Sequence, residues 1–342
     1  MKRALVIGAT GQIGRPTVRA LAEDGWEVLA ASRGGGRDAG WPDGVRAVRL
    51  DREDDGALAS VVGDGCDVVV DTVAYGARHA RQLTGLAGRV GSAVVISSVA
   101  VYQDGRGRSF DTQDRPDGVP RYPVPLPEEQ PTVSPGEDTY AMGKVALERE
   151  LLGAGEKLPA TLLRAAAVHG PYSPLPRELY FVKRNLDGRR RRVLAHRGES
   201  RFHPSGAGTI AELVRLAAAR PGSRVLNACD PTAPSVAEIG AAVDAAMGVE
   251  TETVLLDGEP PSPSVGRTPW STRWPLVCDM SAAARELGYG PGVPYAESVR
   301  ASVDWLVERL AGGRDWREEF PLLARAYPEL FDYAAEDVWL GV

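Results

Sequence analysis

Cysteine and lysine are scarce in this chain, and each shortage narrows the class of protein. The three cysteines, Cys66, Cys229 and Cys278, stand far apart and in no metal-binding or redox spacing. This pattern argues against a disulfide framework and against a zinc site, so we expect a protein of the reducing cytoplasm that holds no metal. Only four of the 40 basic residues are lysines. Each lysine is therefore a candidate for a special role.

Long apolar runs and an excess of positive charge are missing too. No segment stays apolar over the roughly 20 residues that a membrane helix needs, and no secretory signal precedes the first strand-like run. The net charge of −6 and the isoelectric point near 5.5 give the surface no general attraction for nucleic acid or anionic membranes. With 342 residues and 43% hydrophobic content the chain can bury a core. We expect a folded globular protein with neither nucleic acid nor membrane as a partner.

Apolar runs that are typical of buried strands alternate with helical patterns in the first half of the chain. The expected strands are 3–8, 26–32, 45–51, 67–74, 92–98 and 160–168. The helices expected between them are 13–21, 53–63, 77–90 and 138–152. Strands that are buried on both faces and joined by helices form a parallel, doubly wound α/β sheet. The pattern therefore predicts a Rossmann fold.

A change of composition divides the chain further. Prolines and charged residues dominate the segment 103–137, where neither a helix nor a central strand can persist. We predict a Rossmann domain over 1–168 that carries this segment as an insertion, either a lid over the substrate or a surface loop. Residues 169–342 are expected to form mainly a smaller substrate-binding region, with a segment at about 207–230 returning to the first domain.

Three glycines follow the first expected strand at the start of the first helix. Gly8, Gly11 and Gly14 in GATGQIG allow a tight turn and a close approach of a pyrophosphate to the backbone amides at the positive end of the helix. In this strand, turn and helix setting the motif predicts a dinucleotide-binding site. Further contacts to the cofactor are expected from Thr10, Gln12 and Ile13 of the same loop and from Ala74 after the fourth strand.

The residues after the second strand bear on the choice of cofactor. An acid that binds the adenosine ribose of NAD is usual there, but this chain has Ser32 and Arg33 and no acid before Asp38. A hydroxyl and a guanidinium suit a 2′-phosphate, so we expect NADP(H) to be preferred over NAD(H). The alternative interpretation is that Arg33 is a solvated loop arginine that binds no ligand. Asp51, after the third strand, is a candidate either for the adenine edge or for a cap on the following helix.

Tyr140 and Lys144 lie one turn apart on the same face of an expected helix. An isolated phenol titrates near about pH 10. A neighbouring ammonium and a positively charged nicotinamide favour its ionised form, which suits a general acid or base. Ser98, at the carboxyl end of the fifth strand, lies at the edge where such sheets bind ligands and is placed to orient the reacting oxygen. The three residues predict proton handling during hydride transfer.

With GATGQIG, ISSVAVY (96–102) and YAMGK (140–144) in this order, the chain resembles the extended short-chain dehydrogenase/reductase family, in its NAD-dependent epimerase/dehydratase group. The similarity continues in LRAAAVHGPY (163–172), NACDPTAPSVAEIGAAV (227–243) and DMSAAARELGYGP (279–291). The resemblance implies that Ser98, Tyr140 and Lys144 are the catalytic triad and that Lys144 also holds the nicotinamide ribose. It further implies a homodimer formed through a four-helix bundle that includes the Tyr140 helix.

Two departures from the family pattern bear on the reaction. Dehydratases of the family carry an Asp-Glu pair directly after the triad hydroxyl residue, but this chain has Val99 and Ala100 there. Neither residue can transfer a proton, so elimination of water is disfavoured. His169 replaces a tyrosine that is common at its position, and we interpret it as a packing residue.

Candidate substrate residues come from two places. The basic segment 183–201 corresponds to the family region that reaches the diphosphate of nucleotide sugars, and Arg201 resembles its phosphate-binding arginine. Most other cations of the segment fit a solvated helix end. The acidic residue that usually comes shortly after the position of His203 is absent from 204–206, which weakens the assignment to nucleotide sugars. Tyr75 is a second candidate for contact with a small-molecule substrate.

The leading hypothesis is an NADP(H)-dependent oxidoreductase that moves a hydride to or from a carbonyl or carbinol carbon of a small or sugar-like substrate, with Tyr140 as acid and base. The first alternative is a nucleotide-sugar epimerase that retains NAD. A second alternative, of another class, is a non-catalytic dinucleotide-sensing or RNA-associated protein, suggested by the basic segment 183–201. The intact set of Ser98, Tyr140 and Lys144 argues against this last hypothesis.

Overall fold

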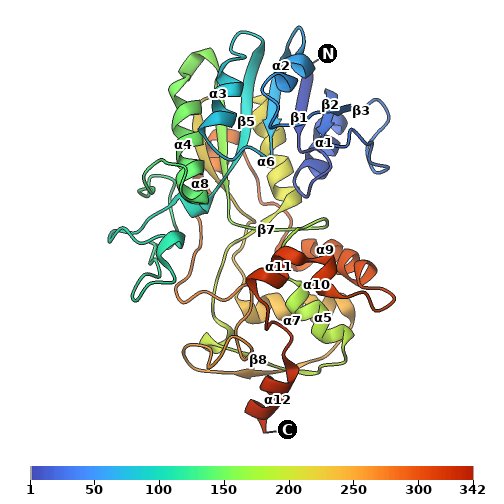
Figure 1. Cartoon of the computed structure of the whole chain (residues 1–342), viewed down its shortest axis with the longest axis vertical. Helices are drawn as coiled ribbons and strands as arrows, with labels where there is room; N and C mark the ends of the chain where they lie inside the picture. The colour runs from blue at the N-terminus through green and yellow to red at the C-terminus, as the bar shows by residue number, and fades with distance from the viewer. Residues whose placement is uncertain (1, 342) are drawn as a thin grey trace. The chain divides into compact units, whose positions relative to one another are not determined.

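The structure, a computed structural model, describes residues 2–341 and divides them into two compact units. The first unit holds the chain up to Ala166 together with Ala207–Cys229 and Cys278–Gly292. The second unit holds Ala167–Gly206, Asp230–Val277 and the chain from Val293 onward. The chain therefore passes between the units several times, and the yellow and orange segments of Figure 1, from the second half of the sequence, contribute to both.

A seven-stranded parallel sheet forms the centre of the first unit (Figure 1). From one edge to the other its strands are β10 (Arg224–Ala228), β6 (Ala160–Ala165), β5 (Val90–Ser98), β4 (Cys66–Asp71), β1 (Arg3–Ile7), β2 (Glu27–Ser32) and β3 (Arg46–Arg49). Ile7 pairs in register with Ala31 on β2 and with Asp71 on β4. The carboxyl ends of these neighbouring strands lie level, so the loops that follow them share one edge of the sheet.

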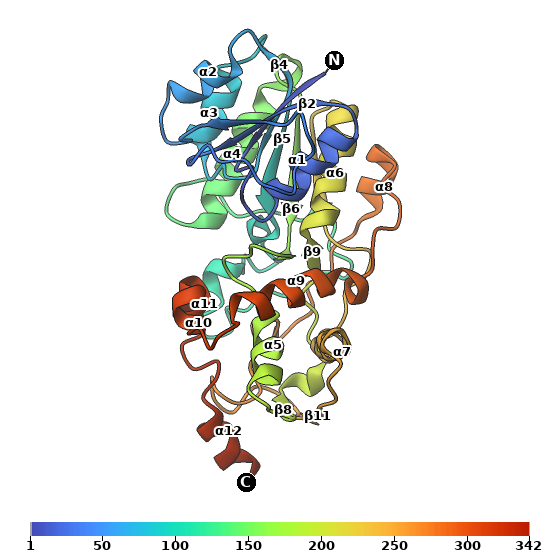
Figure 2. The ribbon, with the colours of Figure 1, turned by 90° about the vertical axis from the view of Figure 1, so that its right-hand side faces the viewer.

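Helices cover both faces of this sheet. They are α1 (Gly14–Glu23), α2 (Ala57–Val62), α3 (Ala77–Thr84), α4 (Tyr140–Gly153), α6 (Ala207–Ala219) and α8 (Ser281–Leu287). Figure 2 shows α1, α6 and α8 on one side of the sheet and α2 and α3 on the other, where α4 packs against α3. The doubly wound Rossmann fold that the sequence predicts is confirmed.

One continuous apolar core fills the space between the sheet and the helices α2, α3 and α4. Leu5 of β1, Val69 of β4 and Val95 of β5 are fully buried in it. Leu83 of α3 and Leu147 of α4 complete the cluster from the helix side. Each fully buried side chain of this kind contributes about 1.5–3 kcal/mol relative to an exposed one. The central strands β1, β4 and β5 are largely apolar because the opposite face of the sheet is buried as well.

The Pro-rich insertion 103–137 is folded against the first unit. An antiparallel bridge joins Tyr102 to Thr132. The Tyr122 hydroxyl donates to the Tyr102 carbonyl oxygen at 3.0 Å, and Leu126 is fully buried. The insertion therefore packs on the end of β5 through defined contacts, although its prolines prevent it from forming a regular strand or a long helix.

The second unit contains two small parallel sheets. They pair β7 (Ala167–His169) with β9 (Pro204–Gly206), and β8 (Arg191–Leu194) with β11 (Glu252–Leu255). Its helices are α5 (Leu179–Leu186), α7 (Val236–Met247), α9 (Tyr295–Arg309), α10 (Trp316–Glu319), α11 (Pro321–Ala326) and α12 (Tyr333–Leu340). Phe181, Ile239 and Val299 join α5, α7 and α9 in one buried cluster. None of the described helices is both long and apolar enough to cross a membrane.

The structure differs from the sequence expectations in two segments. The run 160–168, expected as one strand, is divided, because β6 ends at Ala165 and β7 begins at Ala167 with a new partner strand. The run is apolar throughout, so nothing in it marks the residue at which the hydrogen bonds change partner. Segment 279–291, placed by resemblance with the substrate-binding region, contains α8 and lies in the first unit.

Candidate active site

The glycine loop after β1 forms a turn that leaves no room for larger residues. Gly8 has a φ of +80°, and a Cβ there would lie 2.3 Å from Oγ1 of Thr72. A Cβ on Gly14 would lie 2.1 Å from the Gly8 carbonyl oxygen, so the first turn of α1 comes very close to the strand end. The strand order also reverses between β1 and β4, where parallel sheets bind ligands. The loop therefore fits a pyrophosphate that lies against the first amides of α1.

Thr10, Gln12 and Ile13 belong to the same loop, which Arg15 holds in place. The Nε atom of Arg15 donates to the Thr10 carbonyl oxygen at 2.8 Å, and its Nη1 atom forms an ion pair with Asp38. Ile13 is the N-cap residue of α1. Asp38, the first acid after β2, is therefore already neutralised by an arginine in the first turn of α1.

The segment after β2 carries the residues expected to meet the adenosine ribose. Ser32 is 8% exposed, and its hydroxyl oxygen accepts a hydrogen bond from the Gly35 amide at 3.1 Å. Arg33 is exposed and has no hydrogen-bond or ion-pair partner among residues 2–341. Asp51 is exposed, and its Oδ1 atom accepts a hydrogen bond from the Glu53 amide at 3.1 Å. Asp51 thus caps the turn after β3 and does not cap the helix α2, whose N-cap is Gly56. Arg33, by contrast, is free to meet a ligand.

Tyr140 is the first residue of α4, and the helix cap sets its place. The Thr139 hydroxyl oxygen accepts a hydrogen bond from the Met142 amide at 3.2 Å. The same hydroxyl donates to Oδ2 of Asp111 at 2.7 Å. Asp111 belongs to the insertion 103–137, so the insertion stabilises the start of the helix that carries Tyr140.

The ammonium of Lys144 is buried between the ends of β4 and β5. Its Nζ atom donates to the carbonyl oxygens of Ala74 at 2.6 Å and Ile96 at 2.8 Å. It also lies 5.6 Å from the centre of the Tyr140 ring. Burial lowers the pKa of Lys144 from 10.5 to about 8, although nearby carboxylates attract its charge and oppose the shift. The Lys144 ammonium therefore loses its proton not far above neutral pH.

The Ser98 hydroxyl accepts a hydrogen bond from the Ala100 amide at 3.1 Å, as the cap of the short 3-10 turn Val99–Val101. Burial raises the pKa of Tyr140 above 10.0, and the nearby Ser98 hydroxyl acts in the opposite direction. The Tyr140 side chain remains 48% exposed. The phenol thus keeps its proton at neutral pH.

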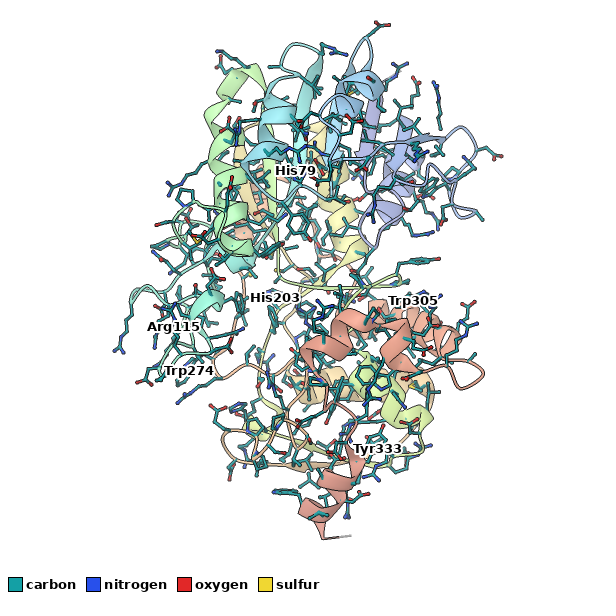
Figure 3. The ribbon with its side chains drawn as sticks, viewed as in Figure 1. His79, Arg115, His203, Trp274, Trp305 and Tyr333 are labelled. Carbon is teal, nitrogen blue, oxygen red and sulfur yellow. The ribbon has the colours of Figure 1, made fainter. Side chains whose placement is uncertain are left out.

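Two residues that the sequence analysis did not single out hold the loop of Tyr75. The Tyr75 amide donates to Nδ1 of His79 at 2.9 Å, and Nε2 of His79, a residue labelled in Figure 3, lies 3.0 Å from Oε1 of Glu53. A Cβ on Gly143 would come 3.2 Å from the Tyr75 carbonyl oxygen, so α4 approaches this loop closely. Tyr75 is 62% exposed, and its ring meets that of Tyr140 edge-on with 5.7 Å between the centres. Tyr75 and Tyr140 therefore form an exposed aromatic pair.

A buried ion pair lies one helical turn from Lys144. Glu148 of α4 accepts hydrogen bonds from Nη2 of Arg164 at 2.6 Å and from Nε of Arg164 at 3.0 Å. The Ser97 hydroxyl donates to the same carboxylate at 2.6 Å. These contacts tie α4 to β5 and β6, beside the strand end that carries Ser98. The sequence signal for them is weak, since a charged residue in an apolar run does not name its partner.

Arg201, the expected phosphate ligand, lies in the second unit and is engaged by protein groups. Its Nη1 atom donates to the Ala233 carbonyl oxygen and lies 3.5 Å from Oε2 of Glu238. Carboxylates also neutralise most cations of segment 183–201. The ion pairs are Lys183–Asp187, Arg184–Glu336, Arg189–Asp337, Arg191–Glu252, Arg192–Asp244 and Arg197–Asp257. This pairing leaves little free positive charge for a polyanion and weakens the RNA-associated alternative.

His169 lies in the interior of the second unit. Its Nε2 atom is 2.6 Å from Oδ2 of Asp230, and its ring centre is 4.9 Å from that of Tyr295. With 1% exposure the residue packs against its neighbours, in agreement with the interpretation of the sequence.

A family model described as the NAD dependent epimerase/dehydratase family matches residues 4–208, more than half of the chain. Among curated proteins, the chain is 32% identical over 170 residues to the 2′-dehydrokanamycin reductase of Streptomyces kanamyceticus. That match covers 49% of this chain and 43% of the relative, which is less than half of either protein.

Solved structures share the fold along most of the chain. The Bordetella bronchiseptica enzyme WbmH in complex with NAD+ is 21% identical, covers 92% of this chain and 100% of its own, and has a TM-score of 0.68. The UDP-glucose 4-epimerase of Thermotoga maritima with UDP-glucose is 20% identical, covers 90% of this chain and 99% of its own, and has a TM-score of 0.67. At these identities the likeness concerns the fold, and the arrangement of strands and helices is the same Rossmann type.

Proposed function

Because the chain belongs to the NAD dependent epimerase/dehydratase family, we propose that it is an NADP(H)-dependent oxidoreductase that reduces a carbonyl group of a small, sugar-like substrate. The observation that carries this proposal is the cluster of Ser98, Tyr140 and Lys144 at the carboxyl edge of the sheet. The glycine loop of the same unit is the proposed cofactor cradle. The second unit is then the main substrate-binding region.

Each residue of the cluster has a separate role in the proposed reaction. When bound, the nicotinamide cofactor supplies the hydride. Ser98 donates a hydrogen bond to the substrate oxygen and polarises it. Tyr140 gives its phenolic proton to that oxygen as negative charge develops, and the ammonium of Lys144 stabilises the phenolate that remains. Because burial raises the pKa of Tyr140, the phenol holds the proton that reduction requires, which favours reduction over oxidation.

The preference for NADP(H) rests on the charges around the end of β2. Arg33 is exposed and unpaired among the described residues, so its guanidinium can bind a 2′-phosphate. The hydroxyl of Ser32 offers a donor next to it. Asp38 does not compete for a ribose, since its carboxylate is paired with Arg15.

The substrate class is proposed from the reductase relative and from what the site lacks. The relative is named as a reductase of 2′-dehydrokanamycin, which points to a carbonyl on a sugar-like ring. Val99 and Ala100 carry no group that transfers a proton, so the site does not support elimination of water. Simple reduction of a ketone requires only a hydride from the nicotinamide cofactor and the Ser98, Tyr140 and Lys144 cluster.

The first test concerns the cofactor. Mass spectrometry identifies any dinucleotide released from the purified protein, and fluorescence titration of the stripped protein compares NADPH with NADH. We expect weakly held cofactor and tighter binding of NADPH. Consumption of NADPH is then followed with 2′-dehydrokanamycin, keto sugars and keto-sugar phosphates. Tyr140→Phe should lower kcat about 10²- to 10⁴-fold without changing the affinity for NADPH.

Other results would favour the alternatives. Tightly retained NAD with no net consumption of NADPH would favour the nucleotide-sugar epimerase, because an epimerase returns its hydride to the same substrate. An unchanged biological activity in Tyr140→Phe would favour a non-catalytic, dinucleotide-sensing role.

A further inference from the structure

Arg177 is half-buried in the second unit, and it differs from the buried Arg184 and Arg192 because no carboxylate is paired with it. Its guanidinium carbon lies 5.3 Å from the centre of the Phe202 ring and 5.8 Å from that of Trp270. By contrast, Arg184 and Arg192 form ion pairs at 2.6 and 2.7 Å. No carboxylate oxygen within residues 2–341 comes as close to Arg177 as an ion pair requires.

Arg177, Phe202 and Trp270 form a cluster in which two enclosed nitrogen atoms have no hydrogen-bond partner among the described residues. They are Nε of Arg177 and Nε1 of the fully buried Trp270. Both atoms are donors, and buried donors in native proteins are nearly always paired. Burial lowers the pKa of the Arg177 guanidinium, the direction expected for a cation without a close counter-charge. The cluster therefore has donors in excess and lacks an acceptor.

Glu178, the next residue in the chain, does not supply that acceptor. It is 1% exposed, and its Oε1 atom accepts a hydrogen bond from the Tyr295 hydroxyl at 3.3 Å. Its charge attracts Arg177 from beyond ion-pair distance. None of the described residues therefore supplies the missing acceptor, and solvent or a bound anion can take its place. A phosphate or carboxylate presents two oxygens in the geometry that a guanidinium edge binds, and the aromatic rings beside it strengthen the attraction by excluding water.

We propose that Arg177 anchors an anion-binding site in the second unit, and that this site takes the phosphate or carboxylate group of the substrate. The identification of the anion with the substrate rests on the proposed function, whereas binding of the anion does not. Arg201 is the weaker candidate because Ala233 and Glu238 already engage its guanidinium. The inference predicts that a phosphorylated or acidic keto sugar is turned over faster than the neutral sugar.

Thermal unfolding of the full chain tests the site without turnover. The probes are inorganic phosphate and acetate in a low-salt buffer, and saturating NADPH keeps the dinucleotide site occupied. We expect at least one probe, at ten times its Kd, to raise the Tm of the wild type by about 2 °C. The probe that acts identifies the ligand group as phosphate or carboxylate.

Three variants assign the response to Arg177. Arg177→Met should abolish the response to the probe and raise the Tm measured without it, because a cation lacking a partner is no longer buried. Arg273→Met is the matched control, since Arg273 is an exposed arginine 5.6 Å from the ring centre of Trp274, which Figure 3 labels. It should leave the response unchanged. Trp270→Phe keeps the ring, removes the N–H donor, and should weaken the affinity for the probe roughly three- to tenfold.

The proposal is overturned if neither probe shifts the Tm of the wild type, or if Arg177→Met keeps the response. In the second case the anion binds elsewhere and Arg177 only packs between two rings. If Arg177→Met does not fold, an unchanged affinity in Trp270→Phe has the same meaning. Failure of the proposed function is a separate result, because an intact anion response without NADPH consumption would keep the site and remove only its assignment to a substrate.

Discussion

The ammonium of Lys144 lies 5.6 Å from the centre of the Tyr140 ring, yet the two hydrogen bonds that place it go to the backbone carbonyl oxygens of Ala74 and Ile96. The strand ends, and not the tyrosine, therefore hold the lysine. This arrangement keeps the amine near the phenol whether or not the phenol is ionised. It also buries an ammonium, which has consequences for stability that can be measured.

Lys144 should make the stability of the protein depend on pH above neutrality. Burial lowers the pKa of Lys144 from 10.5 to about 8. Between these values the unfolded chain still binds the proton that the folded chain has lost, so raising the pH favours the folded state. The free energy of unfolding of the wild type should therefore rise relative to that of Lys144→Met between about pH 8 and pH 10.5. Urea unfolding at several pH values measures this difference.

Lys157→Met is the matched control for this experiment, because Lys157 is exposed. Its unfolding free energy should follow that of the wild type across the whole range. If the curve of Lys144→Met also runs parallel to the wild type, the pKa of Lys144 is not lowered and its burial has been misjudged.

Ser98 should set the pH at which the oxidative direction becomes fast. Oxidation of a carbinol needs the ionised phenol, so kcat/KM rises as the pH passes the pKa of Tyr140. The nearby Ser98 hydroxyl lowers that pKa. Ser98→Ala should therefore move the rise to higher pH and also lower kcat about 10²- to 10³-fold, through loss of a positioned donor. A pH–rate profile with NADP⁺ measures both effects. Ser98→Thr keeps the hydroxyl and should keep the position of the rise, and an unshifted profile in Ser98→Ala would contradict the coupling.

Arg33 should discriminate between the two dinucleotides. Loss of a charged hydrogen bond to a 2′-phosphate weakens binding about ten- to a hundredfold. Arg33→Ala should therefore raise the Kd for NADPH by this factor and leave the Kd for NADH nearly unchanged, as measured by fluorescence titration. Arg46→Ala is the control, since Arg46 is an exposed arginine at the amino end of β3, where it pairs with Leu29. Equal losses for both cofactors in Arg33→Ala would mean that the residue supports the loop and does not bind the phosphate.

The buried pair of Glu148 and Arg164 should be essential for stability but replaceable as a pair. Glu148→Ala leaves the buried guanidinium of Arg164 without its carboxylate and should lower the free energy of unfolding by about 3–5 kcal/mol. The double variant Glu148→Leu with Arg164→Leu should lose less than Glu148→Ala, because no unpaired charge remains. Glu23→Ala, which removes an exposed partner of Arg19, should have little effect. Urea unfolding compares the variants, and a double variant less stable than Glu148→Ala would contradict this account.

The fold of the first unit could be predicted because its strands carry their own signal. β1 and β4 are apolar along nearly their whole length, as strands buried on both faces must be, and the helices between them supply the alternation of a doubly wound sheet. The division of 160–168 at Ala166 could not be predicted, since both halves of the run are equally apolar. Hydrogen-bond partners change there because of strands that lie elsewhere in the chain.

The candidate site divides in the same way. Ser98, Tyr140 and Lys144 could be found from their order and spacing, and the structure brings them together in the first unit. The residues that support the site could not be predicted from the sequence. His79 accepts a hydrogen bond from the backbone amide of Tyr75, and Arg164 pairs with Glu148 on another element. Such contacts leave no local pattern.

By itself the sequence determined the alternation of strands and helices, the glycine turn and the spacing of Tyr140 and Lys144. Each of these features depends on residues that are close together in the chain. Only the tertiary structure decided which charges are neutralised. Arg201 lies beside Glu238, whereas Nε of Arg177 has no partner among the described residues. Whether an arginine meets a carboxylate depends on segments that are distant in the sequence. A counter-ion is a property of the folded neighbourhood, and for that reason the proposed anion site became visible only in three dimensions.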